Sequence, residues 1–214
     1  MLTLYDYLPS QNAWKIRQLL AHLALPYTTV EISIFEGAGR TPEILALNPT
    51  GKVPILVVED GRALAESNAI LAYLADGTPY LPAEPLARAR VHQWLSFEQE
   101  QVESVIGSLR YWTMTGKLDR RSDELVAGKR KAALRTLALL DQQLSTRPFI
   151  AGDGYSIADI ALYAYGGHAD EAGLDVAPFV HVADWRRRVE SQPGFLAERY
   201  PYSIDPFSQG ELPG

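Results

Sequence analysis

A short proline-rich stretch divides this chain into two parts with different patterns. Residues 76–85 run Asp-Gly-Thr-Pro-Tyr-Leu-Pro-Ala-Glu-Pro, a composition typical of an extended linker. Strand and helix patterns alternate before this stretch, and only helical spacing follows it. Because 214 residues are enough for two small domains, we expect residues 1–76 to form an α/β domain, 77–86 a linker and 87–214 an all-helical domain.

The first part has a mixed strand and helix pattern. Residues 2–7 and 27–34 are rich in strand formers, and a helical pattern begins between them at about Ala13. A crossover of this kind pairs its two strands in parallel and is right-handed. A short helix after Thr41 and then a hairpin and helix over residues 53–74 complete the predicted order, βαβ-α-ββα.

Residues 48–67 contain the features that best indicate a ligand site. Turn residues occupy positions 48–51, and the apolar run that follows has proline as its second residue, Pro54. Proline cannot donate to a strand ladder, so Pro54 belongs at the start or the edge of a strand. A cis Val53–Pro54 bond would turn the backbone N–H and C=O of Val53 outward, toward an extended peptide.

A helix is predicted to start near Ser67, thirteen residues after Pro54. Backbone N–H groups at a helix start favour a carboxylate, and the neighbouring Glu66 could hold an ammonium group. A small peptide with a free amino-acid end needs these groups together with a backbone pairing edge. The alternative is structural: Ser67 caps its helix and Glu66 is a solvated charge.

Composition excludes several classes of site. The chain has no cysteine, so it has no disulfide, no thiolate zinc site and no thiol chemistry of its own. A net charge of −6 disfavours a nucleic-acid surface. No segment reaches the length of a membrane span, so we expect neither a membrane nor a nucleic-acid partner, and a cytoplasmic protein fits. The histidines lack metal-ligand spacing, and no metal is expected: His22, His92, His168 and His181.

The second part is expected to consist of helices. Long amphipathic patterns cover residues 86–111 and 122–144. Residues 111–114, Tyr-Trp-Thr-Met, form an aromatic patch that either lines a pocket or belongs to the core. Ser156 followed by Asp159 resembles a capping box, which starts a buried helix. The tail from Tyr200 is expected to be loose.

Three motifs, in order over about 200 residues, resemble the cytosolic glutathione transferases. These proteins have a thioredoxin-like N-terminal domain, a linker and an all-helical C-terminal domain. The first loop, residues 5–17, is similar to that of bacterial members that use a serine. The motifs that carry the resemblance are Asn48-Pro-Thr-Gly-Lys-Val-Pro54, Glu66-Ser67-Asn68-Ala69-Ile70, and Ser156-Ile-Ala-Asp159 after Ala151-Gly152-Asp153.

The resemblance implies a role in glutathione binding for several residues. Val53 would pair its backbone with the cysteinyl part of glutathione, and Pro54 would be cis. Glu66 and Ser67 would hold the γ-glutamyl ammonium and carboxylate. The glycine carboxylate would face two cations, Lys52 and, with less support, Arg40.

The same resemblance places Ser10 beside the glutathione sulfur as a hydrogen-bond donor, with Asn12 as a second donor nearby. A free thiol ionises near pH 8.5, and lowering that pKa by about two units needs about 2.7 kcal/mol. One hydrogen bond to a charged group supplies roughly 1.5–3 kcal/mol, so no catalytic base is required. Tyr5 and Tyr7 remain rival donors, and Ser10 could instead cap the helix that follows.

Three functions stay open at this point. The first is a transferase that activates glutathione, as co-substrate, for attack on an electrophilic small molecule, with Tyr111 and Trp112 in the acceptor pocket. The second is a glutathione-dependent disulfide reductase or peroxidase that uses the same thiolate, as some serine-type relatives do. The third is a binding protein without catalysis. The resemblance also implies a homodimer, in which Glu98 or Gln99 approaches the partner's ligand.

Overall fold

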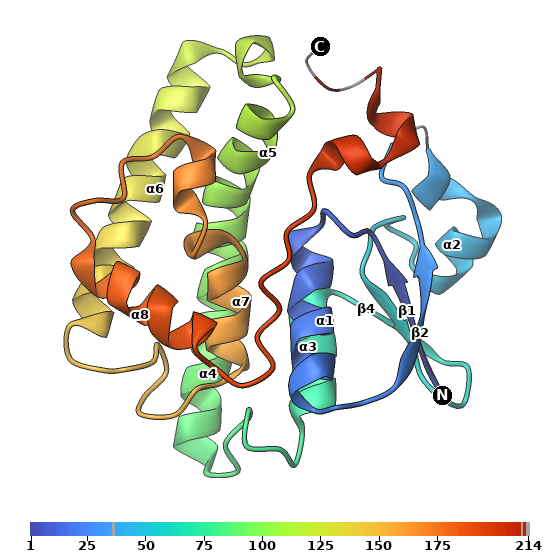
Figure 1. The fold of residues 1–214 in the computed structure, drawn as a ribbon, viewed down its shortest axis with the longest axis horizontal. Helices are drawn as coiled ribbons and strands as arrows, with labels where there is room; N and C mark the ends of the chain where they lie inside the picture. The colour runs from blue at the N-terminus through green and yellow to red at the C-terminus, as the bar shows by residue number, and fades with distance from the viewer. Residues whose placement is uncertain (36, 211, 213–214) are drawn as a thin grey trace. The chain divides into compact units, whose positions relative to one another are not determined.

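The computed structural model describes residues 1–35, 37–210 and 212, and the chain divides into two compact units (Figure 1). One unit contains Met1–Asp76 and Pro193–Leu212, and the other contains residues 77–192. We expected everything after residue 87 to belong to the helical domain. The segment Pro193–Leu212 instead groups with the first unit.

The first unit is built on a four-stranded sheet in the order β2-β1-β3-β4. β1 (Leu2–Asp6) pairs in parallel with β2 (Tyr27–Glu31) and antiparallel with β3 (Ile55–Val57), which pairs antiparallel with β4 (Ala63–Ala65). The parallel pair has the helical crossover that the pattern predicts. This is the thioredoxin-like arrangement that the resemblance implies, and the predicted fold class is confirmed.

Three helices accompany this sheet: α1 (Gln11–His22), α2 (Pro42–Leu47) and α3 (Ser67–Ala75). A short 3-10 turn, Ala38–Arg40, precedes α2. α1 and α3 pack against each other (Figure 1). Their apolar sides and the inner strands contribute residues with no exposed surface, which form the core of the unit: Leu4, Ile16, Leu19, Leu20, Ile55, Leu56, Ile70 and Leu71.

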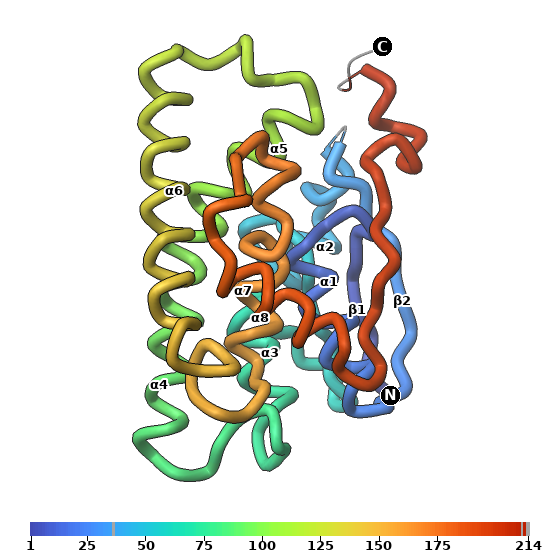
Figure 2. Tube along the Cα trace, turned by 60° about the vertical axis from the view of Figure 1, so that its left-hand side comes forward, coloured from blue at the N-terminus to red at the C-terminus, as the bar shows by residue number. Residues whose placement is uncertain are grey.

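The C-terminal tail joins the first unit because it runs along this unit and is hydrogen-bonded to α1 (Figure 2). The Trp14 indole donates to the Leu196 carbonyl at 3.1 Å, and the Leu196 N–H donates to Gln18 Oε1 at 2.8 Å. Gln18 Nε2 also donates to the Gly194 carbonyl at 3.1 Å. Farther on, Tyr202 is buried. After Tyr200 the chain forms two 3-10 turns, Tyr202–Ile204 and Pro206–Ser208, and the Asp205 carboxylate accepts from the Ser33 hydroxyl at 2.6 Å, so the expectation of a loose tail is wrong.

The second unit is helical over the part that the structure describes. A helical run from Pro85 to Met114 consists of α4 (Pro85–Phe97), a π-helical stretch (Glu98–Gly107) and α5 (Ser108–Met114). The first long helix was expected over residues 86–111, within this run. A 3-10 turn, Leu118–Arg120, leads to α6 (Asp123–Leu144), and the unit continues with α7 (Ile157–Gly166), a 3-10 turn (Ala169–Ala172) and α8 (Val180–Glu190).

The predicted capping box at the start of α7 is confirmed. The Asp159 carboxylate accepts from the N–H and the hydroxyl of Ser156, both at 3.0 Å, from the Ile150 N–H at 2.8 Å and from the Trp185 indole at 2.9 Å. Complete burial raises the pKa of Asp159 to about 6, against the opposing effect of these donors. Asp159 thus ties α7 to α8 and to the turn before α7.

None of the helices in the described residues combines the length and the apolar character needed to cross a membrane.

Candidate functional site

The N-terminal turns of α1 and α3 meet through a side-chain hydrogen-bond network. The Ser67 hydroxyl donates to Asn12 Oδ1 at 3.3 Å and lies 3.4 Å from the donating Lys15 Nζ. The structure thus brings together two residues that were assigned to different parts of glutathione, Asn12 to the sulfur and Ser67 to the γ-glutamyl carboxylate. Lys15 was not among the predicted site residues.

Ser10 is the N-cap of α1. Its Oγ accepts from the Ala13 N–H at 3.3 Å, and its own N–H donates to the Tyr7 carbonyl at 2.8 Å. The capping interpretation of Ser10 is therefore confirmed. A hydroxyl that accepts one hydrogen bond still has a proton to donate, and the half-buried Ser10 lies at the positive end of a helix dipole. Capping is thus compatible with donation to a ligand sulfur.

Arg17 holds the loop that carries Ser10. Its guanidinium contacts Asp6 Oδ1 at 2.5 Å and donates to the Leu8 carbonyl at 2.9 Å. Arg17 and Asp6 are both buried. A buried guanidinium with two partners on β1 and the loop fixes the course of the chain from Asp6 to Ser10.

The loop before β3 presents a free stretch of backbone at Val53. The Val53–Pro54 bond is cis, as expected, and Pro54 directly precedes the first residue of β3. Among the described residues, none hydrogen-bonds to the Val53 backbone. Asn48 orders the loop, because its amide donates to the Lys52 carbonyl at 2.8 Å and its oxygen accepts from the Thr50 N–H at 3.1 Å. An extended peptide could pair with Val53 at this point.

Ser67 begins α3, and Glu66 precedes it with an unusual backbone. Glu66 has φ 69° and ψ 112°, a region that residues other than glycine rarely occupy and that costs about 1–3 kcal/mol. Its carboxylate is exposed, whereas Ser67 is buried. The Ser67 side chain bonds to α1 and not to its own helix start, so the alternative of Ser67 as a simple cap is wrong.

Arg40 and Lys52 come from two loops in direct backbone contact. A side-chain carbon added to Gly39 would lie 2.4 Å from the Gly51 carbonyl oxygen, so only glycine permits this approach. Gly51 itself has a φ of 66°. Arg40 and Lys52 each follow one of these glycines, and both side chains are exposed. The contact therefore brings two flexible cations to one edge of the unit.

Tyr111 and Trp112 lie on α5, in the second unit, and cations face both rings. Lys117 Nζ donates to the Tyr111 hydroxyl at 3.1 Å. The Arg121 guanidinium lies 4.9 Å and Lys129 Nζ 5.7 Å from the Trp112 ring centre. Positively charged side chains therefore lie beside both aromatic rings of this patch. The assignment of the two rings to an acceptor pocket stays a prediction.

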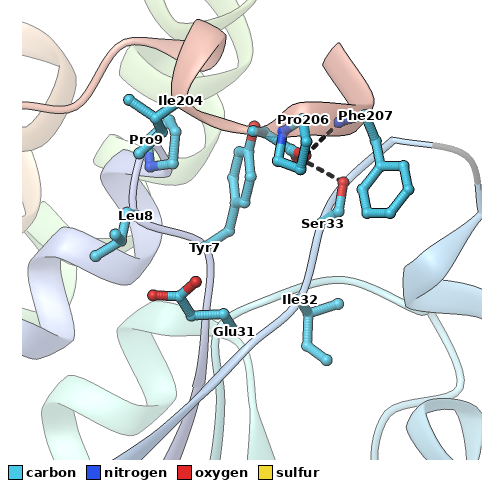
Figure 3. A pocket seen from close by; sticks show the side chains of 10 residues that line it. Tyr7, Leu8, Pro9, Glu31, Ile32, Ser33, Ile204, Pro206 and Phe207 are labelled. Atoms are coloured by element: carbon cyan, nitrogen blue, oxygen red, sulfur yellow. Dashed lines mark hydrogen bonds between the residues drawn. The ribbon is translucent and has the colours of Figure 1, made fainter.

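A hollow of about 240 Å³ lies beside the Ser10 loop (Figure 3). Its lining includes Tyr7 and Pro9 of the loop and Ile204 and Phe207 of the tail. Tyr7 is 5% exposed and stacks against Tyr202 with ring centres 6.3 Å apart. Sequence reasoning missed this hollow because its walls are almost two hundred residues apart in the chain.

Sequence reasoning also missed Lys15. The available signal was a single lysine between Trp14 and Ile16 in an apolar part of the helix pattern. Among the described residues, no group of three acidic or histidine side chains could hold a metal ion.

Comparison with known proteins gives matches over both parts of the chain. The model for the glutathione S-transferase N-terminal domain matches residues 9–76, and that for the C-terminal domain matches residues 100–193. A glutathione S-transferase from Pseudomonas fluorescens is 41% identical, with a TM-score of 0.88, over 91% of this chain and 97% of that one.

Two further relatives have names that state a ligand or an activity. A glutathione transferase from Burkholderia graminis, with two glutathione molecules bound per subunit, is 30% identical, with a TM-score of 0.81, over 90% of this chain and 85% of that one. The disulfide-bond oxidoreductase YfcG of Escherichia coli is 29% identical over 206 residues, which are 90% of this chain and 92% of that protein. Since both domain models match in order and the Pseudomonas structure matches over nearly its whole length, this chain belongs to the glutathione S-transferase family.

Proposed function

We propose that this protein binds reduced glutathione in its first unit and activates the thiol for attack on an electrophilic small molecule. The observation that carries the proposal is the Ser67–Asn12 hydrogen bond of 3.3 Å. It joins the positive ends of two helices into one polar site. A ligand with a thiolate and a carboxylate would interact favourably with both helix ends.

Each part of glutathione finds a group of suitable chemistry. The unpaired Val53 backbone suits the cysteinyl residue, as in strand addition. The exposed Glu66 carboxylate suits the ammonium of the γ-glutamyl end, and the start of α3 at Ser67 suits its carboxylate. Arg40 and Lys52 suit the glycine carboxylate, since both cations project from the same loop contact.

The chemical step needs a thiolate near Ser10. The thiol proton leaves to water, and the Ser10 hydroxyl, with the Asn12 amide as a second donor, hydrogen-bonds to the sulfur. The thiolate then forms a carbon–sulfur bond to the electrophile as the leaving group departs with its electron pair. No covalent enzyme intermediate forms, because among the described residues no histidine or carboxylate hydrogen-bonds to Ser10, as a base that activates a serine nucleophile would.

The remaining parts of the proposal concern the acceptor, the assembly and the location of the protein. We assign Tyr111 and Trp112 to the acceptor pocket, because an aromatic patch suits an apolar electrophile. We also propose a cytoplasmic homodimer, which is what family membership leads us to expect.

The second candidate is a glutathione-dependent disulfide reductase. It is favoured by the match to the oxidoreductase YfcG over 92% of that protein. Because this chain has no cysteine, glutathione must supply every thiol. Two glutathione molecules would reduce one disulfide through a mixed disulfide, releasing two thiols and glutathione disulfide.

The first experiment is calorimetric titration of the full chain with reduced glutathione, followed by two assays. Conjugation is measured with 1-chloro-2,4-dinitrobenzene, and reduction with 2-hydroxyethyl disulfide. Saturable binding with faster conjugation supports the transferase, and saturable binding with faster reduction supports the second candidate. Binding without either activity points to a binding protein, and absence of binding refutes the glutathione site.

A further inference from the structure

Lys15 places a positive charge inside the first unit, directly behind the proposed γ-glutamyl site. Its side chain has no exposed surface. A buried ammonium is costly unless polar groups surround it, so its position constrains what can bind nearby. One of these groups is Ser67, whose Oγ lies 3.4 Å from Lys15 Nζ.

The hydrogen bonds of Ser67 give its hydroxyl a direction. The proton points to Asn12 Oδ1 at 3.3 Å, and a lone pair faces Lys15. A carboxylate at the start of α3 would therefore lie against backbone N–H groups. The Lys15 ammonium would lie on the far side of Ser67, in contact with the Ser67 hydroxyl. In the low dielectric of a buried site, that charge acts more strongly than the exposed cations Arg40 and Lys52 can.

A positive charge at this place would also offset the negative charges that oppose the binding of a carboxylate. The chain has a net charge of −6, and the exposed Glu66 carboxylate lies next to Ser67. Both disfavour an incoming carboxylate. The helix dipole offers only about half a charge, and the positive charge of Lys15 adds to it.

We propose that Lys15 is a specificity-determining residue that selects a ligand with an α-carboxylate at the γ-glutamyl end. This inference rests on the proposed glutathione site. Lys15 acts through the field behind Ser67 and does not itself contact the sulfur or take part in the transfer step.

The test compares two ligands by calorimetry. One is glutathione, and the other is 4-aminobutyryl-cysteinylglycine, which keeps the amine and the thiol but lacks the α-carboxylate. The wild type is expected to bind glutathione at least roughly tenfold more tightly, the effect of one charge-assisted contact. Lys15→Met is expected to bind glutathione at least roughly tenfold more weakly, with the affinity for the analogue unchanged.

Lys52→Met is the matched control, because it removes one lysine that lies outside the γ-glutamyl end. It should weaken both ligands by the same factor and preserve their ratio. If Lys15→Met also weakens both ligands equally, Lys15 has only a structural role and the inference is overturned.

Two further measurements keep the inference falsifiable if Lys15→Met does not fold. Wild-type protein that binds both ligands equally overturns the inference alone, and wild-type protein that binds neither overturns the proposed glutathione site with it. Because the chain has no other cysteine, Lys15→Cys can be alkylated while unfolded with bromoethylamine and then refolded. The restored ammonium should recover the preference for glutathione, and an uncharged propyl group should not.

Discussion

Ser10→Ala removes two interactions that can be measured separately. The first is the N-cap, since Ser10 Oγ accepts from the Ala13 N–H at 3.3 Å. Loss of a serine cap lowers the free energy of unfolding by about 0.5–2 kcal/mol. The second is the proposed hydrogen bond to the glutathione thiolate, which contributes roughly 1.5–3 kcal/mol.

The second interaction predicts the size of a pKa change. At 1.36 kcal/mol for each pKa unit, its loss should raise the thiol pKa of bound glutathione by about 1–2 units. The measurement is the ultraviolet absorbance of the thiolate in the saturated complex as a function of pH. The rate of conjugation should move to higher pH by the same amount, while the affinity for glutathione changes little.

Ser122→Ala is the matched control. Ser122 is the N-cap of α6 in the second unit, and its Oγ accepts from the Leu125 N–H at the same distance, 3.3 Å. This variant should lose comparable stability in urea unfolding and leave the thiol pKa unchanged. If Ser10→Ala also loses stability without any change of thiol pKa, Ser10 is only a cap and the reasoning about the sulfur is refuted.

Three other changes test the rest of the site and its scaffold. Glu66→Ala combined with Ser67→Ala should weaken glutathione binding by roughly tenfold or more in calorimetry, and unaltered affinity would place the γ-glutamyl end elsewhere. Arg17→Met leaves the Asp6 carboxylate buried without its cation, so the free energy of unfolding should fall by about 3–5 kcal/mol; a change under about 1 kcal/mol in urea unfolding would contradict this. For Asp159, burial raises the folded pKa to about 6, above its ordinary 3.8, so the folded state binds a proton between these values that the unfolded state does not. Its contribution should therefore make the protein more stable by about 1 kcal/mol as pH falls from about 7.5 to about 5, and Asp159→Asn should lack this gain; an identical pH dependence in the two proteins would refute it.

Local patterns were enough to predict the elements and part of the site. The position of Pro54 before a strand, the helix start near Ser67 and the capping box at Ser156 all follow from short-range backbone rules. Such rules depend on residues a few positions apart, so a single sequence contains the information that they need.

Other site features depend on which distant segments pack together. The sequence could not show that Ser67 bonds to Asn12 and not to its own helix, because that depends on the packing of α3 against α1. It could not place Arg40 beside Lys52 either, since their loops meet only through the contact of Gly39 with Gly51. These are long-range contacts, which periodicity does not encode.

The sequence by itself determined the class of the fold and the order of the elements before the linker, because backbone preferences are local. Only the tertiary structure decided that the segment Pro193–Leu212 is hydrogen-bonded to α1 and that Lys15 is fully buried. A helix pattern identifies one apolar face. What covers the other faces of α1, and so which of its polar side chains lose contact with water, is decided by segments from elsewhere in the chain.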